Sequence, residues 1–259
     1  GHRIVNITEA PPTGGVREMI LGILGYASGA GITVAGFALD AGPAHATVSR
    51  RVRECLHGLP GDDGPLGADE RRVLDESARA AFAGFTGAFT SHDLVLLHGP
   101  GTAPLIPLIR ANGGRVVWRS HAGSDTENAH TSRAWSFLEP FLNAAQHIVV
   151  NRTTSLPPGL RNTPVSVITP SVDPGATRNL PLAAEDARAT LVRVGVLDGD
   201  GEGATTYRSE TDETRPLPLR DLLVDGPIPS TARLVVQVGD WDSRTDMPGV
   251  LAGFAHHTA

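Results

Sequence analysis

The stretch Arg115-Val-Val-Trp-Arg-Ser-His-Ala-Gly-Ser-Asp125 joins a short apolar run to a polar tail. Its two valines are β-branched, and the Asn-Gly-Gly before it is typical of a turn, so the pattern predicts a buried strand over 115–119. In open parallel sheets, ligands bind just beyond the carboxyl ends of the strands. The tail places a cation, an imidazole and a carboxylate there, and we therefore predict that it belongs to the functional site.

Strand-like and helix-like segments alternate along the chain on both sides of this stretch. Apolar runs predict strands over 3–8, 32–39, 93–97, 115–119, 147–150 and 165–168. Apolar residues at helical spacing predict one helix that begins at Val16 and four more over 46–57, 68–89, 102–111 and 132–144. Such alternation, with strands that are apolar throughout, is typical of a Rossmann-like, doubly wound parallel α/β sheet. We assign it to residues 1–174.

The chain changes character after residue 174. Residues 175–231 contain a polar segment, 198–213, with hardly an apolar residue, and we interpret this region as a linker with a mobile insertion. A strand over 233–238 and a helix from Met247 then form one βα unit. Because such a unit cannot bury its own apolar faces, we expect 232–259 to be the start of a second Rossmann-like domain, incomplete here.

Composition limits the classes of function. The net charge is −6 with a pI near 5.9, which argues against nucleic-acid binding. The chain contains no lysine, so neither a Schiff base nor a P-loop lysine can exist in it. Cys55 is the single cysteine and is interpreted as a small buried hydrophobe, not a nucleophile. With no apolar run of membrane-spanning length, we expect a cytoplasmic protein without membrane contact.

A glycine loop precedes the first predicted helix. Pro11-Pro-Thr-Gly-Gly15 follows strand 3–8, and a strand, glycine loop and helix in this order can point backbone N–H groups at an anion. A plain structural turn explains the same residues. Since the loop is not G-x-G-x-x-G, a nicotinamide-dependent oxidoreductase is disfavoured.

These residues resemble a known family. The chain is similar to the trehalose-synthase-like retaining glycosyltransferases of the GT-B fold, in glycosyltransferase family four (group 1). The segments that carry the resemblance are Thr13-Gly-Gly-Val16, Leu56-His-Gly-Leu-Pro-Gly-Asp-Asp-Gly-Pro-Leu66, Val95-Leu-Leu-His-Gly-Pro100, Val116-Val-Trp-Arg-Ser-His121 with Trp135, Thr169-Pro-Ser-Val-Asp173 and Val236-Gln-Val-Gly-Asp-Trp-Asp242 with Asp246-Met-Pro-Gly-Val250.

The resemblance implies two Rossmann-like domains facing across a cleft. A hexose would pass from a nucleotide-sugar donor to a small sugar-like acceptor, with retention and without a metal or other cofactor. On this analogy His121 is the catalytic residue beside the transferred sugar. The substrate-binding residues implied are Gly14 and Gly15 at the donor diphosphate and His98, Arg119, Asp125 and Asn128 on the acceptor side.

Two positions depart from the family's pattern, and they keep a second interpretation of the function open. Where the family has cations for the donor diphosphate, this chain has Asp240 and Thr245, and Arg244 one residue earlier is the remaining phosphate-binding candidate. A carboxylate there would repel a diphosphate. The alternative is therefore a catalytically degenerate homologue acting as a scaffold, or a subunit that needs a second chain. The expected protein partner is either a homodimer mate or a chain that completes the donor domain.

Overall fold

A computed structural model of the chain describes residues 3–9, 14–85, 87–155, 158–160, 163–176, 179–200, 206–208, 213–216, 228–229, 231–239 and 245–258. The chain divides into two compact units, Gly1–Asp173 and Pro174–Ala259. The first unit carries the residues that decide the fold.

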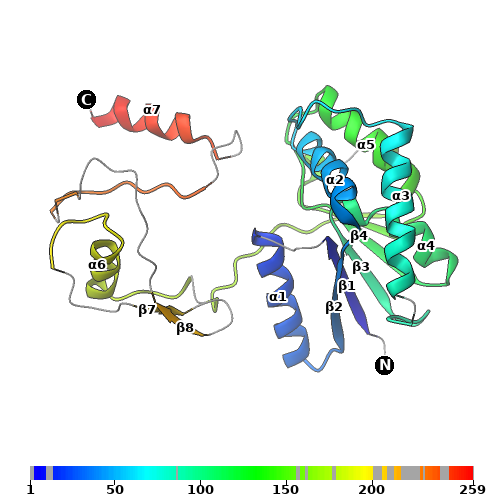
Figure 1. Cartoon of the computed structure of the whole chain (residues 1–259), viewed down its shortest axis with the longest axis horizontal. Coiled ribbons are helices and arrows are strands. Elements are labelled where there is room, and N and C mark those ends of the chain that lie inside the picture. The colour runs from blue at the N-terminus through cyan, green and yellow to red at the C-terminus, as the bar shows by residue number, and fades with distance from the viewer. Residues whose placement is uncertain are drawn as a thin grey trace. The chain divides into compact units, whose positions relative to one another are not determined.

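The first unit is built on a six-stranded sheet in which every pairing is parallel. Its strands are β1 Ile4–Glu9, β2 Val34–Leu39, β3 Leu94–His98, β4 Arg115–Arg119, β5 His147–Val150 and β6 Val165–Val167. The order β2-β1-β3-β4-β5-β6 means that the chain first moves outward to β2, then crosses back and continues the other way (Figure 1). The predicted doubly wound α/β fold is confirmed, and its topological switch point lies between β1 and β3.

Helices cover both faces of this sheet. The helices of this unit are α1 Gly14–Gly29, α2 Gly42–Leu56, α3 Ala68–Phe82, α4 Leu105–Ala111 and α5 Ala129–Leu142. Short 3-10 turns occur at Ala83–Phe85, Pro100–Thr102, Thr153–Ser155 and Pro158–Leu160. In Figure 1, α1 lies on one face, whereas α2 to α5 form a single layer on the other. This opposite placement is what a reversal of strand order requires.

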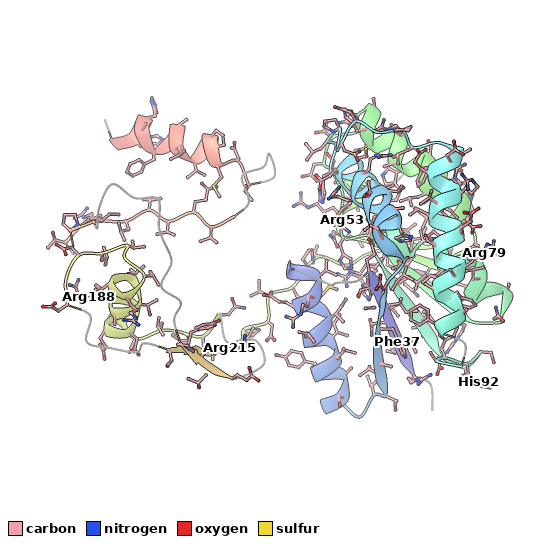
Figure 2. All side chains as sticks on the ribbon, in the orientation of Figure 1. Phe37, Arg53, Arg79, His92, Arg188 and Arg215 are labelled. Carbon is pink, nitrogen blue, oxygen red and sulfur yellow. The ribbon has the colours of Figure 1, made fainter. Side chains whose placement is uncertain are left out.

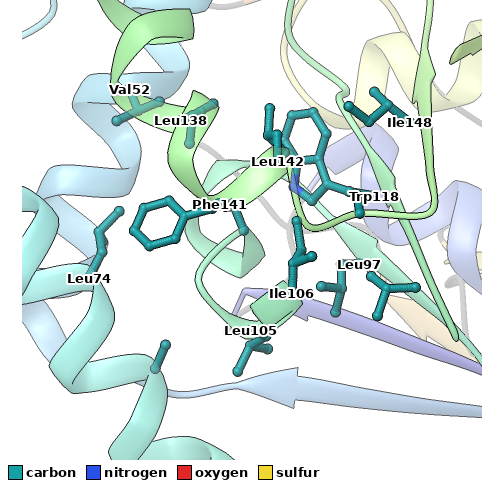
Figure 3. Packing of buried hydrophobic residues seen from close by; sticks show 14 of the residues in the cluster. Val52, Leu74, Leu97, Leu105, Ile106, Trp118, Leu138, Phe141, Leu142 and Ile148 are labelled. Carbon is teal, nitrogen blue, oxygen red and sulfur yellow. The ribbon is translucent and has the colours of Figure 1, made fainter. Parts of the chain in front are cut away.

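The core is centred on β4, as its apolar residues predict. Val116 and Trp118 have no exposed surface, and Trp118 packs with Ile106 and Leu142 between sheet and helices (Figure 3). The Trp118 indole N–H donates to the carbonyl of Gly99 at 2.9 Å, so that its one polar atom is satisfied inside the core. Trp118 thereby anchors β4 to the turn that follows β3.

Two predicted helices are shorter in the structure, for backbone reasons. The helix predicted over 68–89 ends at Phe82 and passes into a 3-10 turn, before Gly87 adopts a φ of 85°. The helix predicted over 102–111 begins at Leu105, because a start at residue 102 would place Pro107 beyond the first turn, where its N–H would be needed. Pro107 is tolerated as the third helical residue, where its missing N–H has no partner in any case.

Helix α5 begins earlier than the predicted residue 132, because Asn128 caps it. The Asn128 side-chain oxygen accepts hydrogen bonds from the backbone N–H groups of His130 and Thr131, at 2.9 and 3.0 Å. The Thr131 hydroxyl accepts from the Asn128 N–H at 2.9 Å, which completes a capping box. The amide nitrogen of Asn128 also donates to the carbonyl of Gly58 at 2.9 Å, tying α5 to the loop after α2.

The second unit contains α6 Ala184–Arg193, an antiparallel pair β7 Thr206–Arg208 and β8 Thr214–Pro216, and α7 Met247–Thr258. The predicted strand over 233–238 is corrected: the segment forms no strand and pairs with none among the described residues. Val236 is 72% and Val238 91% exposed. A strand needs a neighbour for its backbone groups, and the described part of this unit supplies none. Apart from residues 198–200, 206–208 and 213, the predicted insertion lies outside the described residues.

Replacing a buried leucine tests the packing of the core. Leu97→Ala should lower the free energy of unfolding by about 2–5 kcal/mol, because Leu97 in β3 is fully buried and the change leaves a cavity. Leu21→Ala on α1, where the leucine is 46% exposed, is the matched control and should cost much less. Urea unfolding followed by tryptophan fluorescence measures both, and equal losses would contradict this core.

Removing the cap of α5 tests its contribution separately. Asn128→Ala should destabilise the first unit by about 1 kcal/mol, because two helical N–H groups lose their acceptor. Asn128→Asp should retain most of the stability, since a carboxylate accepts the same hydrogen bonds and is favoured at a helix N-terminus. If the two variants unfold at the same urea concentration, the cap is not what stabilises this end of α5.

Candidate functional site

The candidate site lies at the carboxyl edge of the sheet, beside the switch point. Glu9 ends β1, His98 ends β3 and Arg119 ends β4. The β3–β4 register places His98 directly opposite Arg119. His121 follows two residues after β4, and so the strand ends bring together side chains that are far apart in the sequence. Ligands of open α/β sheets bind at this place.

Two histidines form the centre of the site. The Nδ1 of His98 lies 3.0 Å from the Nε2 of His121, and the two rings are nearly parallel, with centroids 5.2 Å apart. On its other side, the Nε2 of His98 lies 3.0 Å from the side-chain oxygen of Asn6 in β1. His98 is 2% exposed, whereas His121 is half-buried. Both histidines are predicted site residues, and the structure brings them into contact.

Burial keeps both imidazoles neutral. It lowers the pKa of His98 to about 4, with the positive charge of Arg119 as the second cause. It also lowers the pKa of His121 to about 3, assisted by His98, Arg119 and Arg53. At neutral pH each ring therefore carries one proton, and it can both donate and accept a hydrogen bond.

Arg119 is a buried cation with unused hydrogen-bonding capacity. It is 9% exposed, and the one hydrogen bond described for its guanidinium runs from Nη2 to the carbonyl of Ile168 at 3.4 Å. Its Nε has no partner among the described residues. Burial lowers the pKa of Arg119, but a guanidinium remains charged at neutral pH. A negative or hydroxyl-bearing ligand at this edge would find donors ready to receive it.

Glu9 is a site residue that sequence reasoning missed. Its carboxylate accepts from the Gly101 N–H at 3.0 Å, from the Ser49 hydroxyl at 2.6 Å and from Arg53 at 3.4 Å. Arg53 belongs to α2, where Figure 2 labels it. A Cβ on Gly101 would lie 2.6 Å from the Glu9 carboxyl carbon, so a larger residue there would displace the Glu9 carboxylate. The signal was present, because Glu9 ends a strand just as His98 and Arg119 do.

A hollow of about 250 Å³ opens beside Glu9, lined also by Asp40 and His45. His45 is 3% exposed, and its Nδ1 lies 2.7 Å from the Ser77 hydroxyl. Its Nε2 is buried without a partner among the described residues. Polar groups thus continue along the carboxyl edge from β3 past β1 to β2.

Asp125 and Asn128 have structural partners within the chain. The Asp125 carboxylate pairs with Arg152 and accepts from the Thr154 hydroxyl at 2.9 Å, and the Arg152 hydrogen bond lowers its pKa. Asn128 caps α5. Their role in acceptor binding stays a prediction.

Gly14 and Gly15 are the first residues of α1 rather than part of the loop before it. A Cβ on Gly15 would meet no atom of the described residues within 4 Å. Arg244, the remaining donor-phosphate candidate, lies outside the described residues, as does Asp240.

Within the described residues no group of three or more His, Cys, Asp or Glu side chains could hold a metal ion. None of the helices described is long and apolar enough to cross a membrane.

Comparisons with known proteins place this geometry in a family. Residues 5–156 match the family model for the trehalose synthase N-terminal domain. The trehalose synthase of Rubrobacter xylanophilus is 25% identical over 202 residues, which are 76% of this chain and 46% of that protein. That of Thermococcus litoralis is 28% identical over 107 residues, 41% of this chain and 25% of the relative. The chain thus spans about half the length of the first relative and a quarter of the second.

The chain is also similar to a solved structure described as "Trehalose-6-phosphate from E. coli bound with UDP-2-fluoro glucose", with a TM-score of 0.53. The match covers 75% of this chain and 55% of the chain in that structure. At 14% identity this likeness supports the GT-B fold alone. The family match covers β1 to β5 and both histidines of the site. The chain is a trehalose-synthase-like protein of the GT-B fold, and it belongs to the trehalose synthase N-terminal domain family.

Proposed function

We propose that this chain is the acceptor-side part of a retaining glycosyltransferase of the trehalose-synthesis type. A hexose would pass from a nucleotide-sugar donor to a small sugar-like acceptor, with no metal or other cofactor. The observation that carries the proposal is the neutral His98–His121 pair, held at the carboxyl edge beside the switch point of a family-typical sheet. The structure described as bound with UDP-2-fluoro glucose suggests UDP-glucose as the donor to test.

The chemistry of sugar transfer suits these side chains. Sugar hydroxyls both donate and accept hydrogen bonds, as a neutral imidazole does, so His121 would hold the transferred sugar. His98 and Arg119 would face the acceptor. The departing nucleotide develops negative charge, which fixed donors stabilise. The N-terminus of the 16-residue helix α1, with Gly14 and Gly15, is suited to the diphosphate, since free N–H groups and the helix dipole favour anions.

A second candidate is a chain that needs another polypeptide to bind the donor, or that acts as a scaffold. Val235 and Val236 are 70% and 72% exposed, and Leu251 and Phe254 on α7 are 59% and 50% exposed. Apolar surface of this kind is favourable to cover. If calorimetry detects UDP-glucose binding only after a second polypeptide is added, the result favours this candidate.

Removing the imidazole of His121 tests the proposed transfer. His121→Ala should lower the rate of trehalose formation from UDP-glucose and glucose by about 10²-fold, the usual effect of losing one oriented polar group in a transition state. His147→Ala is the matched control, because His147 begins β5 at the opposite edge of the sheet. An unchanged rate in His121→Ala, at unchanged circular dichroism, would remove His121 from the site.

The lowered pKa of His98 predicts how stability depends on pH. The folded pKa of about 4 lies below the unfolded value of 6.5, so the unfolded chain binds more protons between these values. Stability is therefore fully present above 6.5 and falls as the pH drops towards about 4, by about 2 kcal/mol at about pH 5 from His98 alone. Urea unfolding at these pH values should show a smaller loss for His98→Gln, which cannot titrate. Equal losses in both proteins would mean that His98 is not buried as a neutral ring.

A further inference from the structure

Asn6 is an exception in its strand. β1 is otherwise apolar at its centre, with Val5 and Ile7 fully buried, yet Asn6 between them is equally buried. Burying an amide without hydrogen bonds costs about 1–3 kcal/mol. The Nδ2 of Asn6 has no partner among the described residues, and its oxygen meets only the ring of His98. An apolar residue at position 6 would stabilise the core more, so the stability of the fold does not explain why an amide is buried there.

The register of the sheet explains how Asn6 reaches the site. Asn6 pairs with Leu96 in β3, and His98 is two residues farther along the same strand. Side chains two residues apart lie on one face of a strand. The amide and the imidazole therefore meet on the same face, and rigid strand pairing rather than a loop holds their 3.0 Å contact.

The contacts then determine where each proton lies. A carbonyl oxygen only accepts, so the Nε2 of His98 must carry hydrogen to bond with Asn6. A neutral ring has one such hydrogen, and the Nδ1 of His98 is then an acceptor. The Nε2 of His121, 3.0 Å away, must donate to it. The single proton of His121 is thus on Nε2, and its Nδ1 keeps a free lone pair.

The charges around the pair favour this state. Arg119 from β4 acts on both rings, and Arg53 from α2 acts also on His121. Both are cations, and each opposes a second proton on the imidazole it acts on. In the described part of the chain, the Nδ1 of His121 has no hydrogen-bond partner.

We propose that Asn6 is a positioning residue which, acting through His98, fixes the proton of His121 on Nε2 and presents Nδ1 as a hydrogen-bond acceptor to the ligand. The ligand group opposite Nδ1 must then be a donor, such as a hydroxyl, and cannot be an ether or phosphate oxygen without a proton. That this hydroxyl belongs to a sugar rests on the proposed function. The assignment of the tautomers of the two rings does not depend on that function.

Nitrogen-15 NMR of the whole chain with labelled histidine tests this directly, because protonated and unprotonated ring nitrogens resonate at widely separated shifts. His98→Gln and His121→Gln identify the two sets of signals. Above about pH 6, both rings should carry their proton on Nε2. A His121 proton on Nδ1 in the unsubstituted chain would overturn the proposal, whatever any variant does.

Asn6→Leu removes the acceptor and keeps the same number of side-chain heavy atoms, branched at the same carbon. His98 then has no preferred tautomer, and the nitrogen signals of both histidines should shift towards the average of the two forms. Thr131→Val is the matched control, since it removes a buried hydroxyl from the α5 cap without touching either ring, and it should leave the signals in place. Unchanged His121 signals in folded Asn6→Leu would show that Asn6 is structural only. No nucleotide sugar enters the experiment, so its outcome is independent of whether the chain transfers glucose.

Discussion

The site depends on the parallel pairing of β3 with β4. This register sets His98 opposite Arg119, and it places the loop after β4 where His121 can reach His98. A slip of one residue would turn every side chain of β4 to the other face and would exchange Val116 and Trp118 for their neighbours in the core. The burial of these two residues therefore holds the register, and through it the chemistry at the strand ends.

Polar groups are buried at this edge at a cost to stability. The Nδ2 of Asn6, the Nε of Arg119 and the Nε2 of His45 are all buried without partners among the described residues. Each such group disfavours folding, and the surrounding core of β-strands and of helices α2 to α5 must offset it. Incomplete polar networks are typical of sites that bind ligands, because the ligand supplies the missing partners. The stability of the surrounding sheet thus holds these polar groups in place before a ligand binds.

The second unit lacks this kind of support. Its predicted strand over 233–238 has the composition of a buried strand, but among the described residues it has neither a neighbouring strand nor a covering helix. Sheet structure is a property of a set of strands, and no sequence of six residues creates it alone. The same local pattern therefore formed a strand at 115–119, between two neighbours, and none at 233–238.

The sequence by itself determined the fold class and the strands of the first unit, and it indicated the loop around His121 as a candidate site. These follow from local periodicity and from the rule that ligands bind at strand ends. Only the tertiary structure decided which polar residues act together. It engaged Asn128 in a helix cap and Asp125 in a pair with Arg152, and it added Glu9 and Asn6, which lie about 90 residues before their partners Gly101 and His98. Such contacts depend on the order of the strands in the sheet, which local hydrophobic patterns do not specify.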